Sequence, residues 1–140
     1  MNSFRIIPKI EVKKFNLVKG YKLEGLRVLG SPLKYIKEYE KSLADEIILE
    51  DVMASILDSL IEKKLIKSIV ENTSIPLSAG GGVKNIKDAD KIFACGADKI
   101  VLCTSAIKTP NLIKDTIKNN DHKIQTHEFK DKINENFKTI

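Results

Sequence analysis

The clearest chemical signal in the sequence is a run of three glycines directly after a short apolar segment. Ser78-Ala79 leads into Gly80-Gly81-Gly82, and residues 85–93 follow with the spacing of a helix. Glycine lets backbone N–H groups approach an anion closely, and the start of a helix adds positive potential. The run matches neither the dinucleotide nor the P-loop glycine motif. It predicts a phosphate site, with a plain tight turn as the alternative.

Polar side chains also stand at the ends of the other expected strands. Glu11 ends the first strand, Asp51 ends the second, and Cys103-Thr104 follows the fourth. In a barrel of alternating strands and helices, the carboxyl ends of all strands meet at one rim, where active sites form. A carboxylate there can act as a general acid or base. Any one of these acids could instead cap the next helix, but their convergence on one rim favours a site.

Cysteine nucleophile and metal chemistry are both disfavoured. Cys103 has no histidine expected beside it, because His122 and His127 both fall in the irregular C-terminal segment. A small packed or rim cysteine is therefore preferred over a nucleophile. The two histidines form no ligand pattern, so we expect no metal and no cofactor. With Cys95 the second of only two cysteines, no disulfide framework is expected, which favours a cytoplasmic location.

The composition is that of one folded domain. The 140 residues are 42% hydrophobic and 31% charged, and the formal net charge is +5. Arg5 and Arg27 are the only arginines, and the lysines alternate with acids, so a solvated surface is favoured over a nucleic-acid surface. No apolar run approaches the length of a membrane span, and the N-terminus lacks a signal-peptide pattern.

Strands and helices alternate along the chain. The apolar patterns predict strands at residues 6–12, 45–51, 75–79 and 97–102. They predict helices at residues 32–44, 56–70 and 85–93 and a fourth that begins at Thr109-Pro110. For the first helix, Ser31 is the expected N-cap and Pro32 the first helical residue. This order predicts a parallel sheet with right-handed crossovers.

Two further features bear on the domain organisation. Ala44-Asp45-Glu46 recurs as Ala97-Asp98-Lys99, each before an apolar strand, which indicates a repeated module. A complete eight-fold barrel needs at least about 200 residues. We therefore expect the N-terminal half of a TIM (βα)8 barrel over residues 1–120, with four parallel strands and outer helices. Residues 121–140 are a divergent tail, in which an amphipathic helix is possible on the spacing of Phe129, Ile133, Phe137 and Ile140.

Together these pieces resemble a known family, the cyclase subunit of imidazole glycerol phosphate synthase, one of the histidine-biosynthesis barrels. The resemblance covers residues 4–117 and is carried by RIIPKIEV, ADEIILEDVMAS, IPLSAGGGVKNIKDA and GADKIVLCTSAIKTPNLI. It implies the first four βα units of a phosphate-binding lyase. That family takes ammonia from a glutaminase partner. It cleaves and cyclises a bis-phosphorylated aminoimidazole carboxamide ribonucleotide to imidazole glycerol phosphate.

The resemblance also implies roles for individual residues. Gly81, Gly82, Cys103 and Thr104 match the first phosphate site, although the family usually has asparagine in place of Cys103. The implied catalytic group comprises a mobile-loop lysine, a rim acid and the position of the catalytic aspartate: Lys19, Asp51 and Glu11. At the opposite end, the implied ammonia gate and glutaminase contact comprise Arg5, Glu46, Lys99 and Asp98.

Two departures from the family pattern favour impaired activity. Glu11 has one methylene more than aspartate, and a displacement of about 1 Å can cost ~10²-fold in rate. A second catalytic aspartate would lie on a fifth strand, which residues 121–140 do not resemble.

Three functions stay open. The first is a cyclase completed by a second half or by oligomerisation, and the second is a non-catalytic module that binds a phosphate ligand or the glutaminase. The third is a paralogue that passes ammonia to a surface-carbohydrate precursor. Open edges at the first and fourth strands, beside an apolar interior, also predict self-association.

Overall fold

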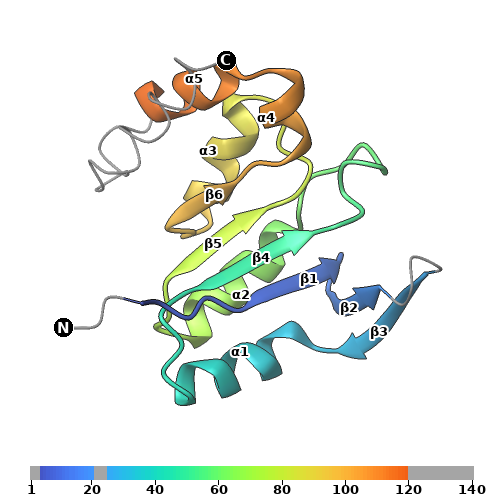
Figure 1. Cartoon of the computed structure of the whole chain (residues 1–140), viewed down its shortest axis with the longest axis vertical. Coiled ribbons are helices and arrows are strands. Elements are labelled where there is room, and N and C mark those ends of the chain that lie inside the picture. The colour runs from blue at the N-terminus through green and yellow to red at the C-terminus, as the bar shows by residue number, and fades with distance from the viewer. Residues whose placement is uncertain (1–3, 21–24, 120–140) are drawn as a thin grey trace.

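Six strands form a single sheet in the computed structural model, which describes residues 4–20 and 25–119 (Figure 1). The tail predicted at 121–140 lies outside the described residues. The sheet order is β3-β2-β1-β4-β5-β6. The strands are β1 (Lys9–Lys13), β2 (Asn16–Gly20), β3 (Leu26–Gly30), β4 (Ile47–Asp51), β5 (Leu77–Gly80) and β6 (Lys99–Val101). Parallel pairs join β1, β4, β5 and β6, which confirms the four predicted parallel strands.

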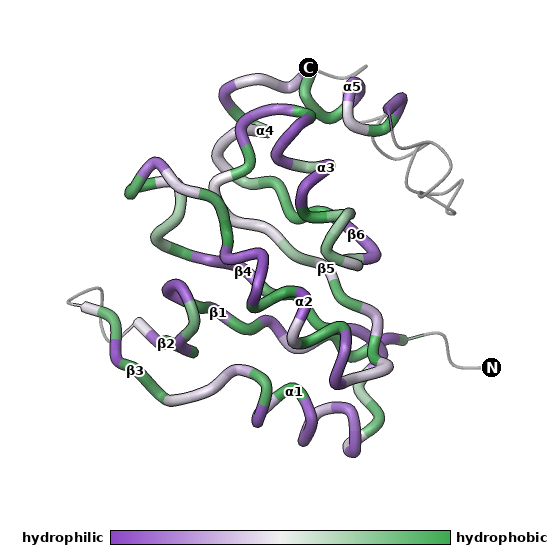
Figure 2. The backbone as a smooth tube through the Cα atoms, turned by 180° about the vertical axis from the view of Figure 1, so that it is seen from behind, coloured by the Kyte–Doolittle hydropathy of each residue, from purple (hydrophilic) through white to green (hydrophobic). Residues whose placement is uncertain are grey.

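The five described helices cover one face of the sheet, the first after the β2–β3 hairpin and the others after parallel strands. They are α1 (Pro32–Lys41), α2 (Lys63–Asn72), α3 (Ile86–Ala94), α4 (Thr104–Lys108) and α5 (Asn111–Asn119). Figure 1 shows α2 behind the strands, and the reverse view of Figure 2 shows it in front of them. Pro32 is the first residue of α1, as expected, and the Asn85 side chain caps α3 by accepting a hydrogen bond from the Asp88 N–H. No helix was expected at α4.

The core lies between the sheet and these helices. Strand residues at alternating positions, Ile10 and Val12 on β1 and Ile47 and Leu49 on β4, are buried. They pack in one cluster with helix residues that include Ile66, Ile69 and Ile92. Because alternate strand residues point to opposite faces, Lys9, Glu11, Ile48 and Glu50 lie on the other face.

The second helix begins later than predicted. It starts at Lys63 rather than Ile56, and Ile56 and Leu57 are 74% and 52% exposed. Residues 52–62 instead form a loop in which the Ser59 N–H donates to the Ala54 carbonyl (2.9 Å). The Ile61 N–H donates to the Gly81 carbonyl (3.0 Å), so this loop folds onto the glycine turn.

Two expectations about exposed surfaces need correction. The first parallel strand is an open edge only over Lys9–Glu11, because Val12 and Lys13 pair with β2, and the β2–β3 hairpin extends the sheet antiparallel. The edges of the described sheet are β3 and β6. The face turned away from the helices is also not simply apolar, since it carries the charged side chains of Lys9, Glu11, Glu50 and Lys99.

Candidate functional site

A cavity of about 270 Å³ opens at the carboxyl ends of β4, β5 and β6. Its lining includes five residues that the sequence singles out: Asp51, Gly81, Gly82, Cys103 and Thr104. They come from three loops that are distant in the sequence and adjacent in the sheet. The remaining lining residues are Glu50, Val52, Ser55, Ile56, Val83, Val101, Leu102 and Ser105.

The glycine turn forms one wall of the cavity and tolerates no side chain. Gly81 has φ +126°, and a Cβ there would lie 2.7 Å from the Asp51 carbonyl oxygen. Gly82 has φ +74°, and its Cβ would overlap the carbonyl of Ser59. Within residues 4–20 and 25–119, the N–H groups of Gly82 and Val83 donate no hydrogen bond. Two backbone donors are therefore free to bind an anion in the cavity.

Asp51 is buried and holds three segments together. Its Oδ1 accepts hydrogen bonds from the N–H groups of Met53 (2.9 Å) and Ala54 (3.0 Å). Its Oδ2 accepts one from the N–H of Lys14, in the turn between β1 and β2 (3.1 Å). The carboxylate therefore shapes the cavity wall through the backbone around it.

Cys103 and Thr104 form the opposite wall. Gly80 pairs with Val101, and a Cβ on Gly80 would collide with Val101, so β6 lies tight against β5. This contact brings residues 102–105 next to the glycine turn. Thr104 begins α4, and both Cys103 and Thr104 are exposed.

Two of the implied catalytic residues do not line the cavity. Glu11 lies on β1, beside Glu50 in the sheet register, with its carboxylate 3.6 Å from the Lys9 ammonium. Lys19 is an exposed residue of β2, paired in register with Arg27 of β3.

Glu50 is a cavity residue that the sequence analysis did not single out. Its Oε2 lies 2.5 Å from the Lys9 Nζ, and the hydrogen bond to Glu50 raises the pKa of Lys9 above its ordinary value although burial opposes the shift. The available signal is the alternation of side chains along a strand. Because Glu50 and Asp51 are consecutive in β4, their side chains point to opposite faces of the sheet, and that of Glu50 points to the face without helices.

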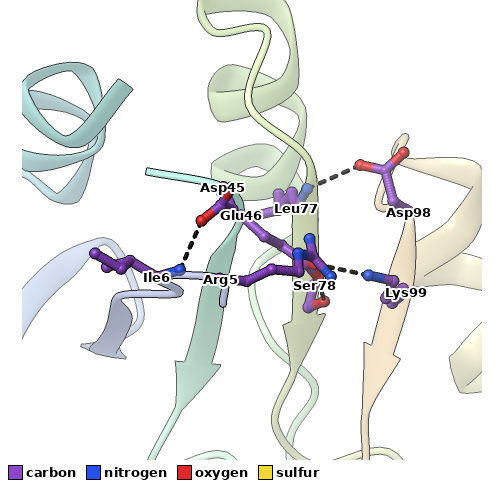
Figure 3. A network of polar contacts seen from close by, with 8 residues as sticks. All are labelled: Arg5, Ile6, Asp45, Glu46, Leu77, Ser78, Asp98 and Lys99. Carbon is purple, nitrogen blue, oxygen red and sulfur yellow. Dashed lines mark hydrogen bonds and ion pairs between the residues drawn. The ribbon is translucent and has the colours of Figure 1, made fainter. Parts of the chain in front are cut away.

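A second group of predicted residues meets at the amino ends of the strands. Figure 3 shows Arg5 and Lys99 on either side of Glu46 and Ser78. Glu46 is 3% exposed, and its Oε2 contacts Arg5 Nη2 at 3.0 Å and Lys99 Nζ at 2.6 Å. The Ser78 hydroxyl donates to Oε1. Burial would raise the pKa of Glu46, but the hydrogen bonds from Lys99 and Ser78 outweigh it and lower that pKa.

The internal repeat also holds in three dimensions. The Asp45 N–H donates to the Ile6 carbonyl (3.0 Å), and its Oδ2 accepts from the Ile6 N–H (2.6 Å). Asp98 does the same with Leu77, at 2.8 Å in both directions. Asp98 thereby clamps the start of β5, and Asp45 clamps the segment that leads into β1 (Figure 3).

The Glu46 cluster predicts acid sensitivity. A carboxyl whose pKa is lowered by folding stabilises the native state above its unfolded pKa, and this contribution is lost as the pH falls through the folded value. We therefore expect the free energy of unfolding to drop as the pH falls below about 4.5, the ordinary value for this group. Urea denaturation between pH 7 and 3 measures it. Glu46→Gln should show a shallower drop, and parallel curves for the two proteins would contradict the assignment.

Comparisons with known proteins match most of this chain to one family. The family described as "Histidine biosynthesis protein" matches residues 5–126. The imidazole glycerol phosphate synthase subunit HisF of Legionella pneumophila is 41% identical over 115 residues, which are 82% of this chain and 54% of that protein. The Petrotoga mobilis subunit is 38% identical over 118 residues, 84% of this chain and 47% of the relative.

The subunit of Lactococcus lactis is 42% identical over 114 residues, which are 81% of this chain and 44% of the relative. The chain thus spans about half the length of the curated relatives it matches. Among the described helices, none combines the length and the apolar character needed to cross a membrane.

Proposed function

Because the chain belongs to the histidine biosynthesis protein family, we propose that it acts in histidine biosynthesis as an imidazole glycerol phosphate synthase cyclase subunit and binds one phosphate group of the substrate. The observation that carries this proposal is the cavity at the carboxyl ends of β4, β5 and β6. The glycine turn predicted from the sequence and the Thr104 hydroxyl line the same 270 Å³ space.

The chemistry of the walls suits a phosphate monoester. The free N–H groups of Gly82 and Val83 and the Thr104 hydroxyl are hydrogen-bond donors for phosphate oxygens. Asp51 is also in the lining, but its oxygens already accept three backbone N–H groups. The phosphate is therefore expected between the glycine turn and Thr104, away from the Asp51 carboxylate.

The cluster at the amino ends supports a role in ammonia entry. The resemblance implies a gate at Arg5, Glu46 and Lys99, and Arg5 and Lys99 each form an ion pair with Glu46. We extend the proposal to a glutaminase partner that supplies ammonia at this end. Asp98, the implied contact to that partner, uses its carboxylate to clamp the Leu77 N–H.

Phosphate binding is tested with Thr104→Ala. A hydrogen bond to a charged group is worth about 1.5–3 kcal/mol, so the variant should bind glycerol 3-phosphate about tenfold more weakly or worse in isothermal titration calorimetry. Thr109→Ala is the matched control, since Thr109 is exposed and does not line the cavity. Equal affinity of the wild type and Thr104→Ala would contradict the proposed site.

A second candidate function is a phosphate-binding module without catalysis, which the position of Glu11 outside the cavity lining favours. Ammonia-dependent formation of imidazole glycerol phosphate by the purified protein separates the two functions. Turnover supports the cyclase, whereas phosphate binding without turnover supports the module.

A further inference from the structure

Glu50 occupies a distinctive position at the cavity. It is the penultimate residue of β4, next to Asp51. In the sheet register it pairs with Gly80, the residue directly before Gly81 and Gly82. It lines the cavity, whereas Glu11, its register partner on β1, does not. Neighbouring strands lie about 4.8 Å apart, so a group bound at the glycine turn lies about one strand spacing from Glu50.

Lys9 makes this carboxylate compatible with a bound anion. Its ammonium lies 2.5 Å from Glu50 Oε2 and 3.6 Å from Glu11 Oε1. Among the described residues, Lys9 is the one charged partner of Glu50. The Glu50 side chain is 17% exposed, so its charge is poorly screened by water, and the lysine offsets it. One oxygen of Glu50 is held by Lys9, which leaves the carboxylate with acceptor capacity for a ligand.

We propose that Glu50 is a specificity-determining residue that accepts hydrogen bonds from hydroxyl or N–H groups next to the bound phosphate, with Lys9 as its positioning residue. The ligand class is a phosphate monoester with a hydroxyl or N–H group on the carbon next to the phosphorylated one, four bonds from phosphorus, such as a polyol phosphate. This inference rests on the proposed function, because it requires the phosphate at the glycine turn.

The Glu50 carboxylate has two effects on a bound ligand. It repels the phosphate dianion and attracts the donor groups of the remaining ligand. Inorganic phosphate experiences only the repulsion, whereas glycerol 3-phosphate experiences both. The ratio of the two dissociation constants, that of phosphate divided by that of glycerol 3-phosphate, therefore reports on Glu50 independently of the phosphate contacts.

The test measures this ratio by calorimetry for the wild type, Glu50→Leu and Glu50→Gln. We expect Glu50→Leu to lower the ratio about tenfold, the effect of one hydrogen bond to a charged acceptor. Its affinity for inorganic phosphate should stay equal or increase, since a negative charge has been removed. Glu50→Gln keeps an acceptor and should recover part of the ratio. A merely structural role would weaken both ligands together.

Glu38→Gln is the matched control, because Glu38 also pairs with a lysine, Lys41 at 3.1 Å, but lies on α1 and outside the cavity lining. It should leave the ratio unchanged. An unchanged ratio in Glu50→Leu, or equal weakening of both ligands, would overturn the role of Glu50 and leave the phosphate site standing. Absence of phosphate and glycerol 3-phosphate binding by the wild type would overturn both proposals.

Discussion

Replacing Gly82 by alanine is expected to destabilise the protein by about 2–5 kcal/mol and to abolish phosphate binding. Gly82 has φ +74°, where a residue with a Cβ is strained by about 1–2 kcal/mol. The new Cβ would also overlap the Ser59 carbonyl, and forcing such a contact apart costs a further 1–3 kcal/mol or so. Urea denaturation measures the stability, and calorimetry with glycerol 3-phosphate measures the site.

Gly20→Ala provides the control for this substitution. Within the described part of the chain, no heavy atom lies within 4 Å of a Cβ at Gly20, and its φ is not positive. Alanine there should leave stability equal or slightly higher, because it reduces the entropy of the unfolded chain. If Gly82→Ala were as stable as Gly20→Ala and still bound glycerol 3-phosphate, the tight approach of the β4–α2 loop to the glycine turn would be disproved.

Asp51→Ala is expected to have the second large effect, a loss of about 3–5 kcal/mol. The substitution leaves the N–H groups of Lys14, Met53 and Ala54 without their acceptor. A hydrogen bond to a charged acceptor contributes about 1.5–3 kcal/mol, and the bonds are not fully additive. Chemical denaturation compares the variant with the wild type.

Asp51→Asn refines the test, because its single carbonyl oxygen can still accept from Met53 and Ala54. We expect Asp51→Asn to recover about half of the stability that Asp51→Ala loses, because the hydrogen bond from the Lys14 N–H is still missing. Asp115→Ala, at an exposed position on α5, should change stability by no more than about 0.5 kcal/mol. An Asp51→Ala protein as stable as Asp115→Ala would show that the carboxylate does not organise the two loops.

The sequence predicts the parallel part of the fold well, because each buried strand is a continuous apolar run between polar turns. The segment from Ile47 to Asp51 and the glycine-ended strand before Gly81 are examples. The glycine turn and Thr104 were also predictable as neighbours, since parallel strands bring their carboxyl ends to one rim. Their meeting in one cavity follows from the order of the strands.

Other features depend on contacts that no local pattern shows. Ile56 and Leu57 have helical spacing with Leu60, but the loop is instead held by the Asp51 carboxylate at its start and by the Gly81 carbonyl, which is distant in the sequence. The β2–β3 hairpin covers β1 through only Val12 and Lys13, a pairing set by the turn at Lys14, where φ is +55°. The ion pair of Glu50 was not predictable from the local sequence, because its partner, Lys9, belongs to another strand.

The hydrogen bonds of Asp45 and Asp98 align the sheet at the amino ends of the strands, whereas the cavity lies at their carboxyl ends. Each clamp fixes the stagger of a strand pair at its amino end, through backbone atoms of Ile6 and Leu77. The cavity residues lie at the opposite ends of the strands or in the loops that follow them. Cavity residues that do not hold the loops together, such as Thr104 and Ser105, can therefore change while the alignment of the sheet is held elsewhere. Ligand chemistry can diverge at these positions at little cost to folding, whereas Gly82 and Asp51 must stay.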